Sequence, residues 1–309
     1  MNIITLTINP ALDKSAKVDG LVPDQKLQCH SIGYQPGGGG INVSRVLNRL
    51  NEQTRCIFTS GGDTGKNLNE LLLKEGINPE TMSVKAWTRE NLSIVDTKTN
   101  FQYRFGMPSH GLQDVELVEL KSVLDKCLSN GDMLVLSGSL PPNVATDYYA
   151  TLIQYVSNKN IRIVIDTSGP ALAEALKEKV FLVKPNQKEL AQWAGKEFLS
   201  SMEQEAFALD RVKSGNATYV VVSLGARGAF MASKDGIVYQ STPSVSVKST
   251  IGAGDSMVAG LIYGIKNDFL VKDILKWGVV CGVATTMNEG TNLASKSHID
   301  NVLKMMNVA

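Results

Sequence analysis

Several features that would narrow the function are scarce or missing in this 309-residue sequence. The four cysteines include no C-x-x-C pair, and the three histidines lie far apart with no metal-ligand spacing. Thirty-one Lys and Arg residues against 30 Asp and Glu leave a net charge of +1, so no basic excess favours nucleic acid or a membrane surface as a partner. No apolar run approaches the roughly 20 residues of a membrane span. The absence of G-x-G-x-x-G argues against a dehydrogenase.

What is present is typical of a globular protein. Hydrophobic residues make up 43% of the chain and charged residues 20%, enough for a sizeable core in one large α/β domain or two modest ones. Scattered cysteines indicate reduced thiols, and we therefore expect a cytoplasmic protein. Residues 1–8 are predicted to form a strand and show neither the charged region nor the cleavage site of a targeting peptide.

Apolar, β-rich runs alternate with helical patterns along most of the chain. The predicted strands are residues 3–8, 56–59, 133–136, 161–166, 181–183 and 219–223. Between them, Val43, Val46, Leu47 and Leu50 follow the i, i+3, i+4, i+7 spacing of a helix with one apolar face. This alternation predicts a mainly parallel sheet covered on both faces, with ligands bound beyond the C-terminal ends of the strands.

Two stretches interrupt this alternation. Residues 13–34 are polar and lack helical periodicity, and residues 88–106 are predicted to form a hairpin. We expect the two to pair into a small separate sheet, which would serve as a lid or as an edge offered to a second subunit. The predicted organisation is an α/β core of residues 1–12, 35–87 and 107–309, with a β lid of residues 13–34 and 88–106.

The most informative stretch is Ser249-Thr-Ile-Gly-Ala-Gly-Asp-Ser-Met-Val258. Gly252, Ala253 and Gly254 allow successive backbone N–H groups to converge where a helix begins, and the positive end of the helix dipole favours an anion there. Asp255 follows directly. It would either cap the helix or take a proton from a hydroxyl that attacks a phosphoryl group, and the stretch alone does not decide between these roles.

Other glycine-rich stretches are individually ambiguous. The four glycines of residues 37–40 would bring backbone close to a ligand, or form a hinge. Residues 61–67 superficially resemble a P-loop, but the glycine spacing is one residue short and Asn67 replaces the Ser or Thr that would bind Mg²⁺, so we interpret them as a strand-to-helix turn. Residues 223–228 follow a strand and would offer a shallow backbone surface to a nucleotide.

Three polar segments also lie where ligands are expected. Residues 137–142 close a strand and are either a plain turn or part of the ligand edge. Asn186 and Glu189 are spaced i, i+3, which is typical of a capping box and also of a carboxylate presented to Mg²⁺. The backbone carbonyls of residues 288–292 would hold a monovalent cation, or the segment is an ordinary loop.

Taken together, these motifs resemble the ribokinase-like carbohydrate kinases of phosphofructokinase B type. Residues 36–43, Pro-Gly-Gly-Gly-Gly-Ile-Asn-Val, are similar to the first family signature, and residues 250–256, Thr-Ile-Gly-Ala-Gly-Asp-Ser, to the second. The resemblance spans essentially the whole chain. It implies a three-layer α-β-α core with a mainly parallel sheet and a small β lid.

The resemblance also implies a reaction, which is ATP-dependent transfer of a phosphoryl group to the primary hydroxyl of a sugar phosphate. Residues 87–92, 184–190 and 221–225 look most like the 6-phosphofructokinases of the family. The expected acceptor is therefore fructose 6-phosphate, giving fructose 1,6-bisphosphate in glycolysis. Fructose 1-phosphate and tagatose 6-phosphate remain alternative acceptors.

Roles for individual residues follow from the same resemblance. Asp255 would be the base, and Gly252, Ala253 and Gly254 would donate N–H groups to the transferring phosphoryl. The sugar would be held by Asp13, Gly38, Gly39 and Asn42, and its phosphate by Lys26, Arg89, Arg104 and Ser139. ATP would contact Lys184, Asn186, Ser223, Gly225 and Gly228, with Glu189 organising Mg²⁺. A K⁺ site is implied at Ser249, Ile251, Thr285, Asn288, Gly290 and Asn292, although Asn292 departs from the basic residue expected there.

Relatives of this type dimerise through the lid, so we expect a homodimer in which Lys26 reaches the neighbouring subunit's site. Two rival functions remain. A kinase of an unphosphorylated sugar or a nucleoside would have no need of the cationic Lys26, Arg89 and Arg104. A catalytically silent nucleotide or sugar sensor would be expected to have lost Asp255 or Glu189, and both are present.

Overall fold

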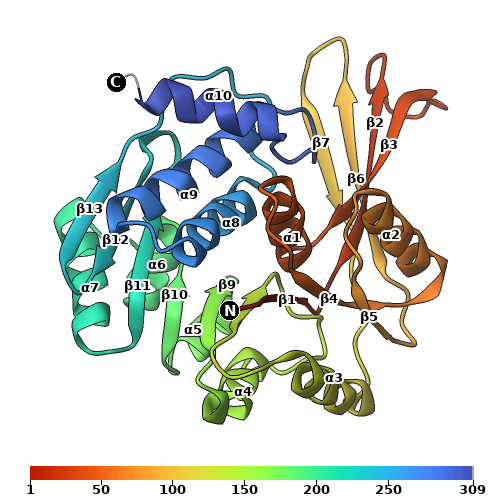
Figure 1. The fold of residues 1–309 in the computed structure, drawn as a ribbon. Helices are drawn as coiled ribbons and strands as arrows, with labels where there is room; N and C mark the ends of the chain where they lie inside the picture. The colour runs from red at the N-terminus through yellow and green to blue at the C-terminus, as the bar shows by residue number, and fades with distance from the viewer. Residues whose placement is uncertain (308–309) are drawn as a thin grey trace.

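A nine-stranded sheet lies at the centre of the computed structural model, which describes residues 1–307. Its order is β13-β12-β11-β10-β9-β8-β1-β4-β5 (Figure 1). The parallel strands are β1 (Ile3–Thr7), β4 (Arg55–Ser60), β5 (Glu80–Ser83), β8 (Met133–Ser137), β9 (Arg162–Asp166), β10 (Val180–Val183) and β11 (Ala217–Ser223). Two antiparallel strands, β12 (Ala229–Ser233) and β13 (Gly236–Gln240), extend one edge.

Both faces of the central strands of this sheet are buried because these strands are apolar at most positions, whereas the edge strand β5 is polar and largely exposed. On β8, Leu134 and Leu136 belong to one hydrophobic cluster, whereas Met133 and Val135 belong to the other. The same period-two division separates the two faces of the neighbouring strands, as strand geometry requires. The predicted mainly parallel sheet with two covered faces is therefore confirmed.

Helices form the two outer layers (Figure 1). One layer contains α1 (Gly39–Arg49), α2 (Gly62–Lys74), α8 (Ala253–Lys266), α9 (Val271–Thr286) and α10 (Lys296–Asn307). The opposite layer contains α3 (Asp114–Cys127), α4 (Tyr148–Tyr155), α5 (Gly169–Ala175), α6 (Gln187–Trp193) and α7 (Ser201–Lys213). Short 3₁₀ turns occur at Ser157–Lys159 and Gly225–Arg227. Within residues 1–307, no helix combines the length and the apolar character that a membrane-spanning segment requires.

A second, four-stranded sheet projects from the core at the upper right of Figure 1 and forms the lid. Its order is β3-β2-β6-β7, built from β2 (Ala11–Val18), β3 (Cys29–Gly37), β6 (Arg89–Asp96) and β7 (Gln102–Gly106). The inner pair β2–β6 is parallel and the two outer pairs are antiparallel. The β6–β7 pair is the hairpin predicted within residues 88–106.

The lid is joined to the core by very short connections. Only residues 8–10 separate β1 from β2, and β3 ends two residues before α1 begins. Since β1 is parallel to its core neighbours, its C-terminal end lies at the ligand edge of the sheet. The lid therefore starts at the edge where the sequence predicts the functional site.

Candidate active site

The N-terminus of α8 offers free backbone donors. Gly252 precedes the helix with φ of +72°, a left-handed conformation that glycine adopts without strain, and a Cβ there would lie 2.5 Å from the Leu293 side chain. Ala253 N–H donates a long 3.3 Å bond to the Thr250 carbonyl. Within residues 1–307, the N–H groups of Gly252 and Gly254 have no hydrogen-bond acceptor. Two of the three predicted donors are thus available to an anion.

Asp255 lies in the first turn of α8 without capping it. Its Oδ2 accepts a 2.8 Å bond from Asn42 Nδ2, which comes from the glycine-rich loop and α1. Burial raises the pKa of Asp255 to about 6, and the nearby Asp166 and Asp13 carboxylates add to the rise, while the Asn42 bond and Lys184 oppose it. The carboxylate is therefore connected to the predicted sugar side of the site rather than used as a helix cap.

A buried ion pair accompanies these groups. Lys184 Nζ lies 3.3 Å from Asp166 Oδ1. The same ammonium would be 3.5 Å from a Cβ placed at Gly254, so it lies beside the free amides. Burial opposes its charge, yet the Asp166, Glu189 and Asp255 carboxylates raise the pKa of Lys184 overall. Lys184 is thus a fixed cation next to an anion-binding helix end.

Asp166 is absent from the site residues predicted from the sequence. This residue ends β9, and Thr167 follows it at the ligand edge. Its position could have identified it, because a carboxylate at the C-terminal end of an apolar strand in a parallel sheet lies at the ligand edge. The same reasoning applies to residues 137–142.

The lid contributes a second polar group. Asp13 on β2 accepts a 2.8 Å bond from Asn91 Nδ2 on the adjacent β6. Arg89 Nη1 donates to Asn91 Oδ1 at 3.1 Å, while Arg89 Nε is buried with no acceptor within the described residues. Burial raises the pKa of Asp13, although Asn91, Arg89 and Arg45 oppose the rise. An unsatisfied guanidinium N–H of this kind suits an oxyanion ligand.

The glycine-rich loop packs tightly against the core. Gly38 has φ of +123°, and a Cβ at Gly39 would collide with the Ser137 hydroxyl and lie 2.9 Å from Gly138 N. This close approach places Asn42 where it can reach Asp255. The alternative of a flexible hinge does not fit such packing.

The remaining residues predicted to bind the sugar phosphate are more scattered. Ser139 is exposed in the loop after β8 and accepts a 3.1 Å bond from Asn9 Nδ2. Lys26 lies exposed between β2 and β3, and Arg104 lies exposed on β7, where it donates to Gln102. Within residues 1–307, neither Lys26 nor Arg104 has a hydrogen bond or ion pair to the other predicted site residues.

A cavity of about 730 Å³ adjoins the free amides of α8. Its polar rim includes Ser223, Gly225 and Gly228, as predicted for the nucleotide, while Met257, Val279 and Val283 line its apolar wall. A parallel bridge between Asn186 and Ser223 brings the start of α6 to the same strand end. The cavity is large enough for a nucleotide and opens onto the anion-binding helix end.

Asn186 and Glu189 form a capping box at the start of α6. Asn186 Oδ1 accepts from Glu189 N–H at 2.9 Å, and Glu189 Oε2 accepts from Asn186 N–H at 2.8 Å. The capping box, one of the two roles predicted for this motif, is therefore present, and it leaves Glu189 Oε1 free. No group of three acidic, His or Cys side chains suited to a metal occurs within residues 1–307. A single free carboxylate oxygen fits Mg²⁺ that is held mainly by nucleotide phosphates and water.

The predicted K⁺ loop lies between α9 and α10, and the N–H groups of Lys248 and Ser249 donate to the Thr286 carbonyl at the end of α9, just before it. Thr285 Oγ1 is already engaged, because it donates to Ser256 Oγ and accepts from Ala294 N–H. Asn288 N–H donates back to the Thr285 carbonyl at 3.1 Å. Thr291 Oγ1, by contrast, is buried without a partner within the described residues. This hydroxyl, absent from the predicted set, fits a cation ligand better than Thr285 does.

The rest of the predicted K⁺ set consists of Ser249, Ile251, Gly290 and Asn292. Ser249 Oγ accepts from Ile251 N–H at 3.3 Å, and Asn292 Nδ2 donates to the Glu289 carbonyl at 3.0 Å. These bonds help to fix the backbone conformation of residues 249–251 and of residues 289–292. Backbone carbonyls, which K⁺ accepts as readily as side chains, would be the ligands.

Free amides at a helix start, a carboxylate in the same helical turn, a buried cation and an adjoining nucleotide-sized cavity together define a phosphotransferase. The chain belongs to the pfkB family of carbohydrate kinases, whose model matches residues 7–298. Its three-layer core and lid are those of the ribokinase-like structures, so the predicted fold class is confirmed.

Several individual relatives are similar to this chain over nearly its whole length. The chain is 38% identical over 297 residues to ATP-dependent 6-phosphofructokinase isozyme 2 of Escherichia coli, with 96% of each chain covered. Phosphofructokinase-2 from Escherichia coli in complex with potassium matches with a TM-score of 0.94 at 36% identity over 99% of both chains. The same enzyme in complex with fructose-6-phosphate matches with a TM-score of 0.93 at 35% identity, again over 99% of both. A 1-phosphofructokinase of Bacillus subtilis is 32% identical over 93% of each chain.

Proposed function

We propose that this kinase transfers the γ-phosphoryl of ATP to the primary hydroxyl of fructose 6-phosphate. One observation carries the proposal. Asp255 is bonded to Asn42 on the sugar side and directly follows the free amides at the start of α8, which adjoin the nucleotide cavity. In-line phosphoryl transfer requires a base on one side of the reacting atoms and an anion site for the phosphoryl group on the other.

The geometry supports a distinct role for each carboxylate oxygen of the proposed base. Asp255 Oδ2 is held by Asn42, which leaves Oδ1 to take the proton of the attacking hydroxyl. The N–H groups of Gly252 and Gly254 and the Lys184 ammonium would stabilise the charge of the transferring phosphoryl. Because the hydroxyl proton becomes acidic only as the bond to phosphorus forms, a carboxylate that is ionised at neutral pH is a competent base.

The acceptor assignment depends on the lid. Asp13 and Arg89 lie on adjacent strands, and the unsatisfied Arg89 Nε points to a phosphorylated rather than a neutral sugar. Similarity to isozyme 2 favours fructose 6-phosphate over fructose 1-phosphate and tagatose 6-phosphate. Lys26, Arg104 and Ser139 are proposed as further contacts to the sugar's phosphate, with Lys26 acting from a second subunit.

Two cations complete the proposed chemistry. Mg²⁺, when bound with ATP, neutralises phosphate charge, and the free Oε1 of Glu189 would orient its water shell. K⁺ would lie between residues 249–251 and 288–292, held by backbone carbonyls and the Thr291 hydroxyl. Neither Ser249 Oγ nor Thr285 Oγ1 needs to leave its present partner for this arrangement.

A homodimer is proposed from the outer face of the lid. Register places Tyr34, Lys14, Leu92 and Phe105 in one row across the four strands, on the face opposite Asp13. Tyr34 and Phe105 are exposed, as is Ile32 on the same sheet. A second copy of this sheet would cover these apolar side chains. We propose the cytoplasm as the location, since all four cysteines are free thiols.

A substrate panel tests the function. ADP release with Mg-ATP should give the highest kcat/KM for fructose 6-phosphate, with lower values for tagatose 6-phosphate and fructose 1-phosphate and none measurable for unphosphorylated fructose. A higher kcat/KM for fructose 1-phosphate would reassign the acceptor. Binding of ATP without turnover of any of the sugars would instead support the silent sensor.

A further inference from the structure

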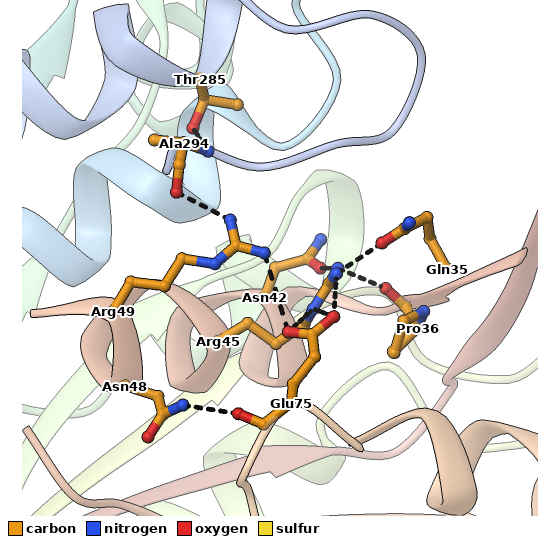
Figure 2. A network of polar contacts seen from close by, with 9 residues as sticks. All are labelled: Gln35, Pro36, Asn42, Arg45, Asn48, Arg49, Glu75, Thr285 and Ala294. Atoms are coloured by element: carbon orange, nitrogen blue, oxygen red, sulfur yellow. Dashed lines mark hydrogen bonds and ion pairs between the residues drawn. The ribbon is translucent and has the colours of Figure 1, made fainter. Parts of the chain in front are cut away.

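We propose that the buried Arg45–Glu75 pair is a positioning device that fixes both the glycine-rich loop and the Asn42 amide against Asp255. The inference rests on the proposed function, because Asp255 must be the base for its orientation to matter. None of the roles derived above uses Arg45 or Glu75. Figure 2 shows both residues at the centre of a polar network beside the site.

Arg45 is a charge placed deep in the protein. Its side chain is only 1% exposed, whereas that of Glu75 is 27% exposed. Arg45 Nη2 donates to Glu75 Oε1 at 2.5 Å, and Nε donates to Oε2 at 2.9 Å, giving a two-pronged pair between α1 and the end of α2. A buried guanidinium needs such a partner, so the carboxylate fixes where the Arg45 head group lies.

The rest of the Arg45 fork reaches the glycine-rich loop. Nη1 donates to the Pro36 carbonyl at 2.9 Å, immediately before the four glycines, and Nη2 donates to Gln35 Oε1 at 2.6 Å. Glycines have no side chains that could anchor the loop, so its path depends on its packing against the core and on contacts at its entrance. Arg45 supplies that anchor at the junction between lid strand β3 and α1.

Arg45 also acts on Asn42. Its Nη1 lies 3.5 Å from Asn42 Oδ1, while Asn42 Nδ2 donates to Asp255 at 2.8 Å. Arg offers only donors and an ionised carboxylate offers only acceptors, so the two neighbours demand the same orientation of the Asn42 amide. Rotating that amide by 180° would set its oxygen against Asp255 and its NH₂ against the guanidinium.

Glu75 extends the network toward the other side of the site. Its Oε2 lies 3.7 Å from Arg49 Nη2, and Arg49 Nη1 donates to the Ala294 carbonyl at 2.7 Å. Ala294 N–H donates in turn to Thr285 Oγ1 (Figure 2). One carboxylate thus connects the sugar loop to the chain segment that follows residues 288–292.

The decisive variant is Arg45→Lys. Lysine keeps the charge opposite Glu75 but, with a single ammonium, it would not reach Glu75, Pro36 and Asn42 together. We expect kcat to fall by about 10- to 100-fold and the KM for fructose 6-phosphate to rise by about tenfold, with the KM for ATP within about twofold. The acid limb of kcat should also move to higher pH, because the Asn42 bond that lowers the pKa of Asp255 is weakened. Asp166, Lys184 and Asp13, the other charged groups facing Asp255, are unchanged in this variant.

Glu52→Gln is the matched control. Glu52 is 17% exposed and pairs with Lys266 of α8 at 2.6 Å, so its loss breaks a partly buried ion pair at the opposite end of α8. It should lower stability without changing either KM or the acid limb. A role of Arg45 in stability alone would make Arg45→Lys behave in the same way.

These measurements distinguish a failure of the positioning role of Arg45 from a failure of the proposed kinase function. Unchanged sugar KM and acid limb in a folded Arg45→Lys protein would refute the positioning role. If that variant does not fold, Glu75→Asp, which shortens the partner by one methylene and keeps its charge, decides by the same measurements. Wild-type protein that phosphorylates no sugar would overturn the proposed function instead, and would be recognised before any variant is made.

Discussion

The protonation of Asp255 can be tested quantitatively. With its pKa raised to about 6, the carboxylate is about 90% ionised at pH 7 and about 10% ionised at pH 5. A step that needs the ionised base therefore slows about tenfold over this range. If the pKa were at its ordinary value of 3.8, the same change would cost less than about a tenth of the rate.

The assay is kcat for ADP release between pH 5 and 8 at constant ionic strength, with both substrates saturating. Saturation matters because the second ionisation of a phosphate monoester also lies near pH 6 and would distort kcat/KM. Asp255→Asn should reduce turnover by at least about 100-fold and leave a residual rate without the acid limb. A wild-type kcat that is flat from pH 7 to pH 5 would refute the assigned base.

The same pKa has a consequence for stability. Because the folded-state pKa of Asp255 is above its unfolded value of 3.8, ionisation opposes folding; the penalty is absent below about pH 4, grows up to about pH 6 and is constant above it. At about 1.4 kcal/mol per pKa unit, the rise amounts to at most about 3 kcal/mol. Asp255→Asn should therefore be more stable than wild type at pH 7 and no more stable at pH 4, as measured by urea unfolding. Lower stability of the variant at pH 7 would contradict this account of Asp255.

Three further substitutions test the surrounding site. Arg89→Ala should raise the KM for the sugar phosphate about 10- to 100-fold with little change in kcat, since it removes a charge-assisted bond far from the reacting atoms; an unchanged KM would mean that Arg89 is misassigned. Glu189→Gln should increase the Mg²⁺ concentration needed for half-maximal rate several-fold, whereas Glu203→Gln, in the equivalent capping box of α7, should share only its small loss of stability. Equal Mg²⁺ requirements in both would leave Glu189 with a capping role alone. Ile32→Asp should convert the proposed dimer to a monomer in sedimentation, and a persistent dimer would exclude the lid face as the interface.

The strands of the core could be predicted where tertiary context agrees with local pattern. All six predicted core strands are present, with ends within two residues of the expected ones, because long apolar runs in a two-faced sheet leave little ambiguity. Strands β5, β12 and β13 were not predicted. They lie at or near the edges of the sheet, where polar side chains such as Glu80 and alanines such as Ala229 weaken the β signal.

Without the family resemblance, the candidate active site is predictable only where it is encoded locally. Gly252, Ala253, Gly254 and Asp255 are consecutive, so a short motif reveals them. Asp166 and Glu75 are single carboxylates brought in from distant elements, and no spacing marks them. The Asn186–Glu189 spacing allows a capping box or a carboxylate for Mg²⁺; the structure shows the cap, and the role in binding Mg²⁺ stays a prediction.

The attachment of the lid has a final consequence. Strand β2 follows β1 after only residues 8–10, and β2 and β6 are the strands that carry Asp13 and Arg89. Any swing of this sheet must carry those side chains with it. Because Asp13 and Arg89 are the proposed sugar contacts, a cross-link that fixes the lid to the core should slow both binding and release of the sugar.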